Sequence, residues 1–139
     1  MQYKIDEQLA EEEFIKICED WEIDIDESNM DSEEKIDFKS VKVKVIKAIR
    51  LGRLVYNSDG TIIYTLSKHS IDFVGTELTI KVPDGVAYTD MDQFKKDKDM
   101  HKTFTILSYM IGKPLPVINK LDGRDLKPLL ALASLFLAD

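Results

Sequence analysis

Hydrophobic and polar positions recur along this chain with two different periods, which separate helical from extended segments. Residues 7–21 place apolar side chains on one helical face and charged ones on the other, as in an amphipathic helix. A stretch rich in acids, Ser and Asn follows, and Asp31 or Ser32 is suited to cap the next helix. Residues 33–51 contain VKVKV, which alternates like a strand, but their longer apolar pattern predicts a helix ended by Gly52.

The stretch RLVYNSDGTIIYTL gives the clearest strand pattern in the sequence. Two β-rich runs flank NSDG, and Asp-Gly suits the positive φ angles of a tight hairpin turn. A third strand is predicted at residues 77–82, where ELTIKV alternates before Pro83-Asp84-Gly85 turns the chain. These segments together predict a small antiparallel sheet, made of a hairpin plus one strand.

From Thr89 onward the pattern is helical, with a break at Gly112 and Pro114. Asp99 and Asp125 are predicted N-caps of the two late helices, and we expect Pro128 to lie in the first turn of the last one. The predicted fold class is therefore α+β, with a three-stranded antiparallel sheet, about five helices and an all-helical C-terminal half.

The length of 139 residues predicts a single domain with one hydrophobic core. We expect it to consist of an acidic helix and loop at residues 1–40, a helix and the sheet at 41–85, and a helical part at 86–139. No secretory signal or membrane-spanning stretch is recognisable, and Cys18 has no second cysteine to pair with, so we expect a cytoplasmic protein that does not enter a membrane.

The two late helices each carry a second apolar strip beside the face that would form the core. Ile106 and Tyr109 lie outside the core arc of one helix, and Leu132 and Leu135 lie outside that of the last helix. Either both helices are packed on two sides, or the four side chains form a surface for a partner chain or a second copy. They are the candidate partner-binding residues.

Charge is distributed unevenly along the chain, whose net charge is −7. Residues 1–40 hold fifteen acidic side chains against four lysines, a net charge of −11, so the remainder carries +4. This acidic part is either a solvated helix face with a linker or a segment that attracts a basic partner. Direct nucleic-acid binding by it is disfavoured, because phosphate contacts need cations.

Residue patterns that carry catalytic or metal chemistry are not found in this sequence. The glycines form no phosphate-binding loop, His69 and His101 stand apart from other ligands, and Cys18 falls on an apolar helix face. A calcium loop starting at Asp24 would have Lys35 where a bidentate Glu should close it. We therefore expect no catalytic, cofactor or metal site, and a protein that acts by binding rather than as an enzyme.

The chain from residue 78 to 137 resembles the tail assembly chaperones of long-tailed bacteriophages. The stretches EEEFIKICEDWEIDIDE and IKAIRLGRLVYNSDG are also similar to longer members of that group. The shared features are a Pro–x–Gly turn, a helix ending in Gly-x-Pro, and a DL pair before an apolar tail, carried here by Pro83 and Gly85, Gly112 and Pro114, Asp125 and Leu126, and Leu129–Leu137.

The resemblance implies a protein without catalytic residues or cofactor that binds the tape-measure protein and helps recruit tail tube subunits in the bacterial cytoplasm. It also implies that a frameshifted longer form can exist, and self-association is compatible with it. The apolar strips would hold the client in a helix-in-groove mode. The alternative from the charge alone is an acidic decoy that mimics nucleic acid to occupy a basic protein; its binding would weaken steeply with salt.

Overall fold

The computed structural model describes residues 2–70, 75–85 and 99–136. It has the predicted α+β fold, with a three-stranded antiparallel sheet and a helical C-terminal half. The helical segment expected at residues 89–98 lies outside the described residues. The elements in chain order are α1 (Glu7–Asp20), the 3-10 helix η1 (Glu27–Asn29), α2 (Ser32–Arg50), β1 (Leu54–Tyr56), β2 (Ile62–Thr65), β3 (Glu77–Ile80), α4 (Asp99–Ile111), α5 (Leu115–Ile118) and α6 (Gly123–Ser134).

Helix α2 runs through the VKVKV stretch, so the helical prediction for this ambiguous segment is confirmed. The Asp31 side chain caps it by accepting a hydrogen bond of 2.8 Å from the Glu34 amide. After the last turn, Gly52 adopts φ +76°, and the Arg53 amide donates to the Ala48 carbonyl at 3.1 Å. This left-handed glycine cap ends the helix where the sequence predicted.

The hairpin forms where predicted, but its turn differs from the expected one. β1 pairs with β2 in a register that sets Tyr56 opposite Ile62. The Gly60 amide donates to the Asn57 carbonyl at 3.0 Å, and Gly60 has φ +90°, whereas Asp59 does not have a positive φ. The Asp59 carboxylate instead accepts a hydrogen bond from the Thr61 amide. A longer loop with one left-handed glycine therefore replaces the expected two-residue turn.

The third strand, β3, ends at Ile80, two residues before its predicted limit. The reason is that the Lys81 amide donates to the carbonyl of Met110, at 2.8 Å, and so leaves the sheet for the last turn of α4. β3 pairs antiparallel with β2, which makes the strand order β1-β2-β3. One face of this sheet is buried and carries the side chains of Leu54, Ile62, Tyr64, Leu78 and Ile80.

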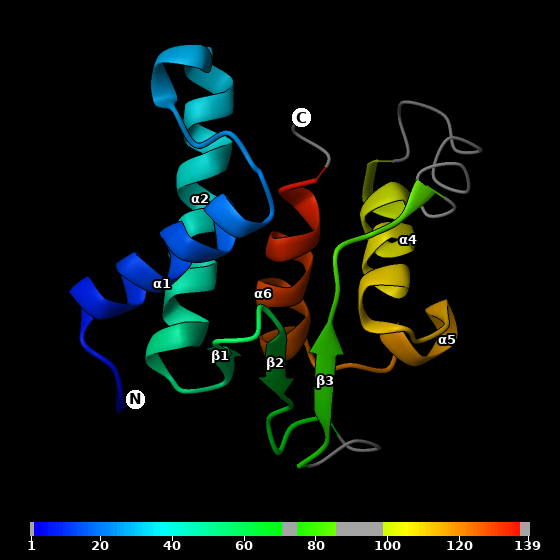
Figure 1. Cartoon of the computed structure of the whole chain (residues 1–139). Coiled ribbons are helices and arrows are strands. Elements are labelled where there is room, and N and C mark those ends of the chain that lie inside the picture. Colours follow the sequence, from blue (N-terminus) through cyan, green and yellow to red (C-terminus); the bar gives the residue numbers. More distant parts are fainter. Residues whose placement is uncertain (1, 71–74, 86–98, 137–139) are drawn as a thin grey trace.

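Helix α6 lies between α2 and α4 and contacts both, while the sheet covers one side of this helical layer (Figure 1). α1 packs across α2, and β3 lies against α4. The buried apolar side chains of the described residues form one continuous cluster. Because α6 has neighbours on both flanks, most of its surface is covered by the chain itself.

The start of α6 differs from the prediction. Asp122, not Asp125, is the N-cap and accepts a hydrogen bond of 2.9 Å from the Arg124 amide. Asp125 lies inside the first turn and is fully buried. Pro128 is in the helix interior, where its missing N–H leaves no bond to the carbonyl four residues earlier.

None of the helices in the described ranges combines the length with the apolar character that crossing a bilayer requires.

Candidate functional site

Three of the four predicted partner-binding residues do not lie on the surface. Ile106 and Leu132 are fully buried, and Leu135 is 3% exposed, whereas Tyr109 is 39% exposed. Of the two alternatives for these strips, packing of the helices on two sides therefore holds for those three residues, and a partner surface does not. The physical reason is the position of α6 between α2 and α4, which buries two sides of each apolar helix.

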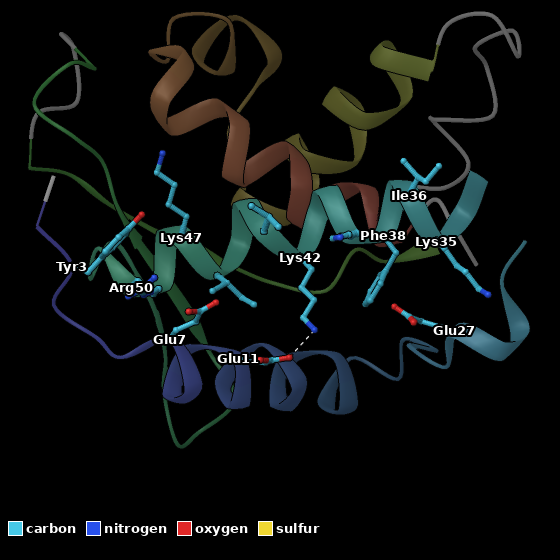
Figure 2. A pocket seen from close by; sticks show the side chains of 13 residues that line it. Tyr3, Glu7, Glu11, Glu27, Lys35, Ile36, Phe38, Lys42, Lys47 and Arg50 are labelled. Carbon is cyan, nitrogen blue, oxygen red and sulfur yellow. Dashed lines mark hydrogen bonds and ion pairs between the residues drawn. The ribbon is translucent and has the colours of Figure 1, made fainter. Parts of the chain in front are cut away.

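An open groove with a volume of about 660 Å³ runs along α1 and α2 (Figure 2). We call it the α1–α2 groove. α2 forms it from Lys35 to Arg50, which corresponds to about 22 Å of helix. This length equals that of a client helix of four turns. The lining residues are Tyr3, Glu7, Glu11, Glu27, Lys35, Ile36, Phe38, Lys39, Lys42, Val43, Ile46, Lys47 and Arg50.

Apolar side chains in this groove remain open to solvent. Ile36 is 69% exposed and Val43 is 58% exposed, and Tyr3 is also exposed. Phe38 lies deeper, where its ring is 6.0 Å from that of Phe14 in the core. Ile36 and Val43 are seven residues apart, so they lie on the same face of α2. The groove therefore presents an apolar stripe whose floor is continuous with the core.

Charged side chains border the stripe with opposite signs. Glu7 and Glu11 come from α1, and the cations come from α2 (Figure 2). One pair is closed, because Lys42 Nζ lies 2.8 Å from the Glu11 carboxylate. This arrangement can accept a helix that has an apolar stripe between charged flanks.

The N-terminal segment closes one end of the groove. The guanidinium of Arg50 lies 4.0 Å from the centre of the Tyr3 ring, and its Nε donates to the Ile5 carbonyl at 3.2 Å. The amides of Lys4 and Ile5 donate to the Arg50 carbonyl in return. Tyr3 is thereby held as a wall of the groove.

The sequence pattern contained a signal for this groove that was not used. Within the amphipathic α2 pattern, Ile36 and Val43 fall outside the face that Val45, Ala48 and Ile49 bury. Their pattern is weaker than the second strips of the more apolar C-terminal helices. Local periodicity could identify an extra stripe on each helix but could not decide which stripe another element covers.

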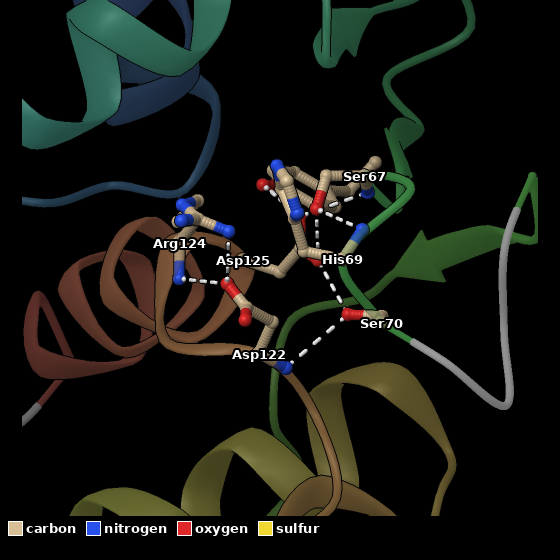
Figure 3. Close-up of polar contacts among 7 residues, drawn as sticks. Ser67, His69, Ser70, Asp122, Arg124 and Asp125 are labelled. Atoms are coloured by element: carbon tan, nitrogen blue, oxygen red, sulfur yellow. Dashed lines mark hydrogen bonds and ion pairs between the residues drawn. The ribbon is translucent and has the colours of Figure 1, made fainter.

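A second feature is a buried polar cluster around Asp125 (Figure 3). The carboxylate accepts hydrogen bonds from the Tyr64 hydroxyl at 3.0 Å, from the Ser67 amide at 3.0 Å and hydroxyl at 2.9 Å, and from the Ser70 hydroxyl. The Ser70 hydroxyl oxygen also accepts a hydrogen bond of 3.2 Å from the Asp122 amide. These bonds join the start of α6 to β2 and the segment after it.

The environment of Asp125 shifts two ionisation equilibria. Burial on its own raises the pKa of the Asp125 carboxyl, but the hydrogen bonds from Ser70, Ser67 and Tyr64 outweigh it and leave that pKa below its usual value. Burial and the nearby Asp125 charge raise the pKa of the Tyr64 hydroxyl. Both oxygens of Asp125 are engaged by structural donors, so the cluster holds the fold together.

Other chemistry-bearing residues are similarly placed for structure. Burial raises the pKa of the Cys18 thiol to about 12, which keeps it protonated and unreactive. The His69 amide donates to the Ser67 hydroxyl at 3.3 Å. In the part of the chain that the structure describes, no three His, Cys, Asp or Glu side chains converge to hold a metal ion.

Neither a family model, nor a curated protein, nor a solved structure matches this chain.

Proposed function

We propose that this chain is a non-enzymatic phage tail assembly chaperone that binds the tape-measure protein and helps recruit tail tube subunits in the host cytoplasm. The observation that carries the proposal is the α1–α2 groove, whose exposed Ile36 and Val43 fit the apolar stripe of a client helix. The choice of the tape-measure protein as the client rests on the resemblance in sequence to such chaperones. The groove replaces the C-terminal strips as the candidate binding surface.

The exposed apolar side chains of the groove would supply part of the free energy of binding a client. Full burial of an aliphatic or aromatic side chain contributes about 1.5–3 kcal/mol. Tyr3, Ile36 and Val43 are about half exposed, so their further burial contributes about 3 kcal/mol in total. The charged side chains along the borders of the groove would fix the orientation of the bound client more than they would increase its affinity. A chaperone that must leave as tube subunits polymerise needs a contact of this moderate strength.

The test is co-expression of this chain with the tape-measure protein of the same genome, followed by measurement of the soluble tape-measure fraction and of affinity. The double substitution Ile36→Asp and Val43→Asp should lower affinity at least tenfold, because charges replace the apolar stripe. Leu9→Asp is the matched control, since Leu9 is an exposed apolar residue of α1 that does not line the groove.

Circular dichroism should show that all these variants keep the wild-type fold. A double variant that stays folded and binds the tape-measure protein as tightly as the wild type would refute the groove as the client site. A wild-type chain that neither binds nor solubilises the tape-measure protein would refute the function itself.

A further inference from the structure

A second, smaller pocket lies at the junction of α2, the sheet and α6, with a volume of about 310 Å³. Five cationic side chains line it, and no acidic side chain does so. We call it the basic pocket; its cations are Lys44, Lys47, Arg53, Arg124 and Lys127. Such a cluster of cationic side chains is unexpected in a chain whose net charge is −7.

The cations of the basic pocket are mostly not neutralised within the described part of the chain. Arg124 lies 3.7 Å from the Asp122 carboxylate, and this is the one ion pair found there that involves a pocket cation. Asp125, next to Arg124 in the sequence, does not line the pocket; it is fully buried, and its oxygens are engaged by Tyr64, Ser67 and Ser70. Like charges held together repel one another, so an anionic group entering the pocket is favoured.

The same chain carries an acidic segment of matching character. Between Glu19 and Glu34, nine of the sixteen residues are Asp or Glu, none is Lys or Arg, and all nine acidic residues are exposed. The segment includes the end of α1, η1 and the start of α2. Among the described residues it has no ion pair to a basic side chain.

The acidic segment cannot fill the basic pocket of its own chain. Its η1 and α2 parts lie at the N-terminal end of α2 (Figure 1), whereas the α2 residues that line the pocket, from Lys44 onward, lie toward the C-terminal end of that helix. At 1.5 Å per residue, Asp31 and Lys47 are about 24 Å apart along the helix axis. α2 is a continuous helix between them and holds the two regions apart.

We propose that the basic pocket binds the acidic segment of a second copy of this chain, so that copies associate head to tail. The charges are complementary, and the pocket is a bounded hollow rather than a track for a long polyanion, which the exposed carboxylates of this chain would repel. Because the two surfaces differ, the interface is heterologous, and repetition of it builds a ring or a filament. The proposal does not depend on the client of the α1–α2 groove.

The experiment uses two charge-reversal variants in sedimentation velocity. The pocket variant is Arg124→Glu with Lys127→Glu, and both acids fall near the start of α6, where a helix favours them. The segment variant is Glu19→Lys with Asp20→Lys, and both lysines fall at the end of α1, where cations are favoured. Circular dichroism verifies the folding of both.

At about 50 mM salt the wild type should associate with increasing concentration, and at about 500 mM it should be monomeric, because screening weakens the charge contacts. Each variant alone should be monomeric at both salt concentrations. An equimolar mixture should form a one-to-one dimer at low salt, since the pocket variant keeps its acidic segment and the segment variant keeps its pocket. Arg124→Lys with Lys127→Arg should associate like the wild type.

Three results would overturn the proposal. One is a wild type that stays monomeric at low salt and high concentration, including the case in which the pocket binds inorganic pyrophosphate instead. Another is a mixture of the two folded variants that does not associate. The third is a variant that self-associates alone as strongly as the wild type, which would place the contact elsewhere.

Discussion

The Asp125 carboxylate links the first turn of α6 to residues that precede it by more than fifty positions. Tyr64, Ser67 and Ser70 all donate to it, and the side chain has no exposure to solvent. A buried charge is tolerated only when donors replace its lost hydration. This cluster therefore fixes how α6 docks on the sheet.

We expect Asp125→Asn to lower the free energy of unfolding by about 2–3 kcal/mol, because the amide replaces an acceptor by a donor that faces other donors. Asp122→Asn is the matched control. It should cost less than about 0.5 kcal/mol, since Asn caps helices as well as Asp does. Urea denaturation of both variants measures the difference, and equal losses would contradict this role of Asp125.

The pKa shift of Asp125 predicts a pH dependence of stability. Its pKa is lower in the folded than in the unfolded chain, so its contribution is complete above the unfolded value of about 3.9 and is lost as the pH falls through the folded pKa. The stability gap between wild type and Asp125→Asn should thus be constant from neutral pH to about 5 and narrow below about pH 4. Exposed Asp26, Asp31 and Asp59 also have lowered pKa values, but both proteins contain them. A gap that widens in acid would contradict the prediction.

At the residue scale the sequence could predict caps but not this cluster. Asp31 is one of the two predicted caps because its hydrogen-bond donor, the Glu34 amide, is only three residues away. Asp125 has the same local appearance, an acid just before an apolar helix, but its partners come from a distant segment. No pattern within a few residues distinguishes the two.

Helices α4 and α6 explain at the element scale why the C-terminal part of this chain is so apolar. α6 contacts α2 on one side and α4 on the other, and α4 also contacts α5 and β3. Ile106, Leu132 and Leu135 fill these contacts. Apart from Tyr109, the second strips are therefore parts of the core.

We expect Leu135→Asp to unfold the chain or to cost more than about 3 kcal/mol, because it buries a charge without a partner. Tyr109→Asp on α4 should change stability by less than about 1 kcal/mol, since Tyr109 is partly exposed. Thermal unfolding followed by circular dichroism compares the two. A folded, fully stable Leu135→Asp protein would contradict the burial of this strip.

The presence of the helices and strands could be predicted from the hydrophobic periodicity and from the residues that start and end each element. The hairpin, α2 with its Gly52 end, and the third strand all depend on local signals that the structure confirms. Which faces of α4 and α6 are covered depends on the number of neighbours each helix has. That number is set by tertiary packing and cannot be read from a single helical wheel.

On the scale of the whole molecule, two surfaces are separated by α2. The α1–α2 groove is apolar with charged borders, and the basic pocket faces the start of α6. Lys47 lines both, so the two surfaces adjoin around the helix. A client in the proposed groove and a second copy at the proposed pocket would therefore both lie against Lys47.

The most direct test of the central claim is methyl NMR of this chain, labelled at Ile, Leu and Val, during titration with the tape-measure protein. The methyl signals of Ile36, Val43 and Ile46 should shift or broaden, because these residues line the groove that we propose as the client site. The signals of Leu132 and Leu135 should not change, because α6 is covered by the chain itself. Changes concentrated on Leu132 and Leu135, with the groove signals unmoved, would contradict the account.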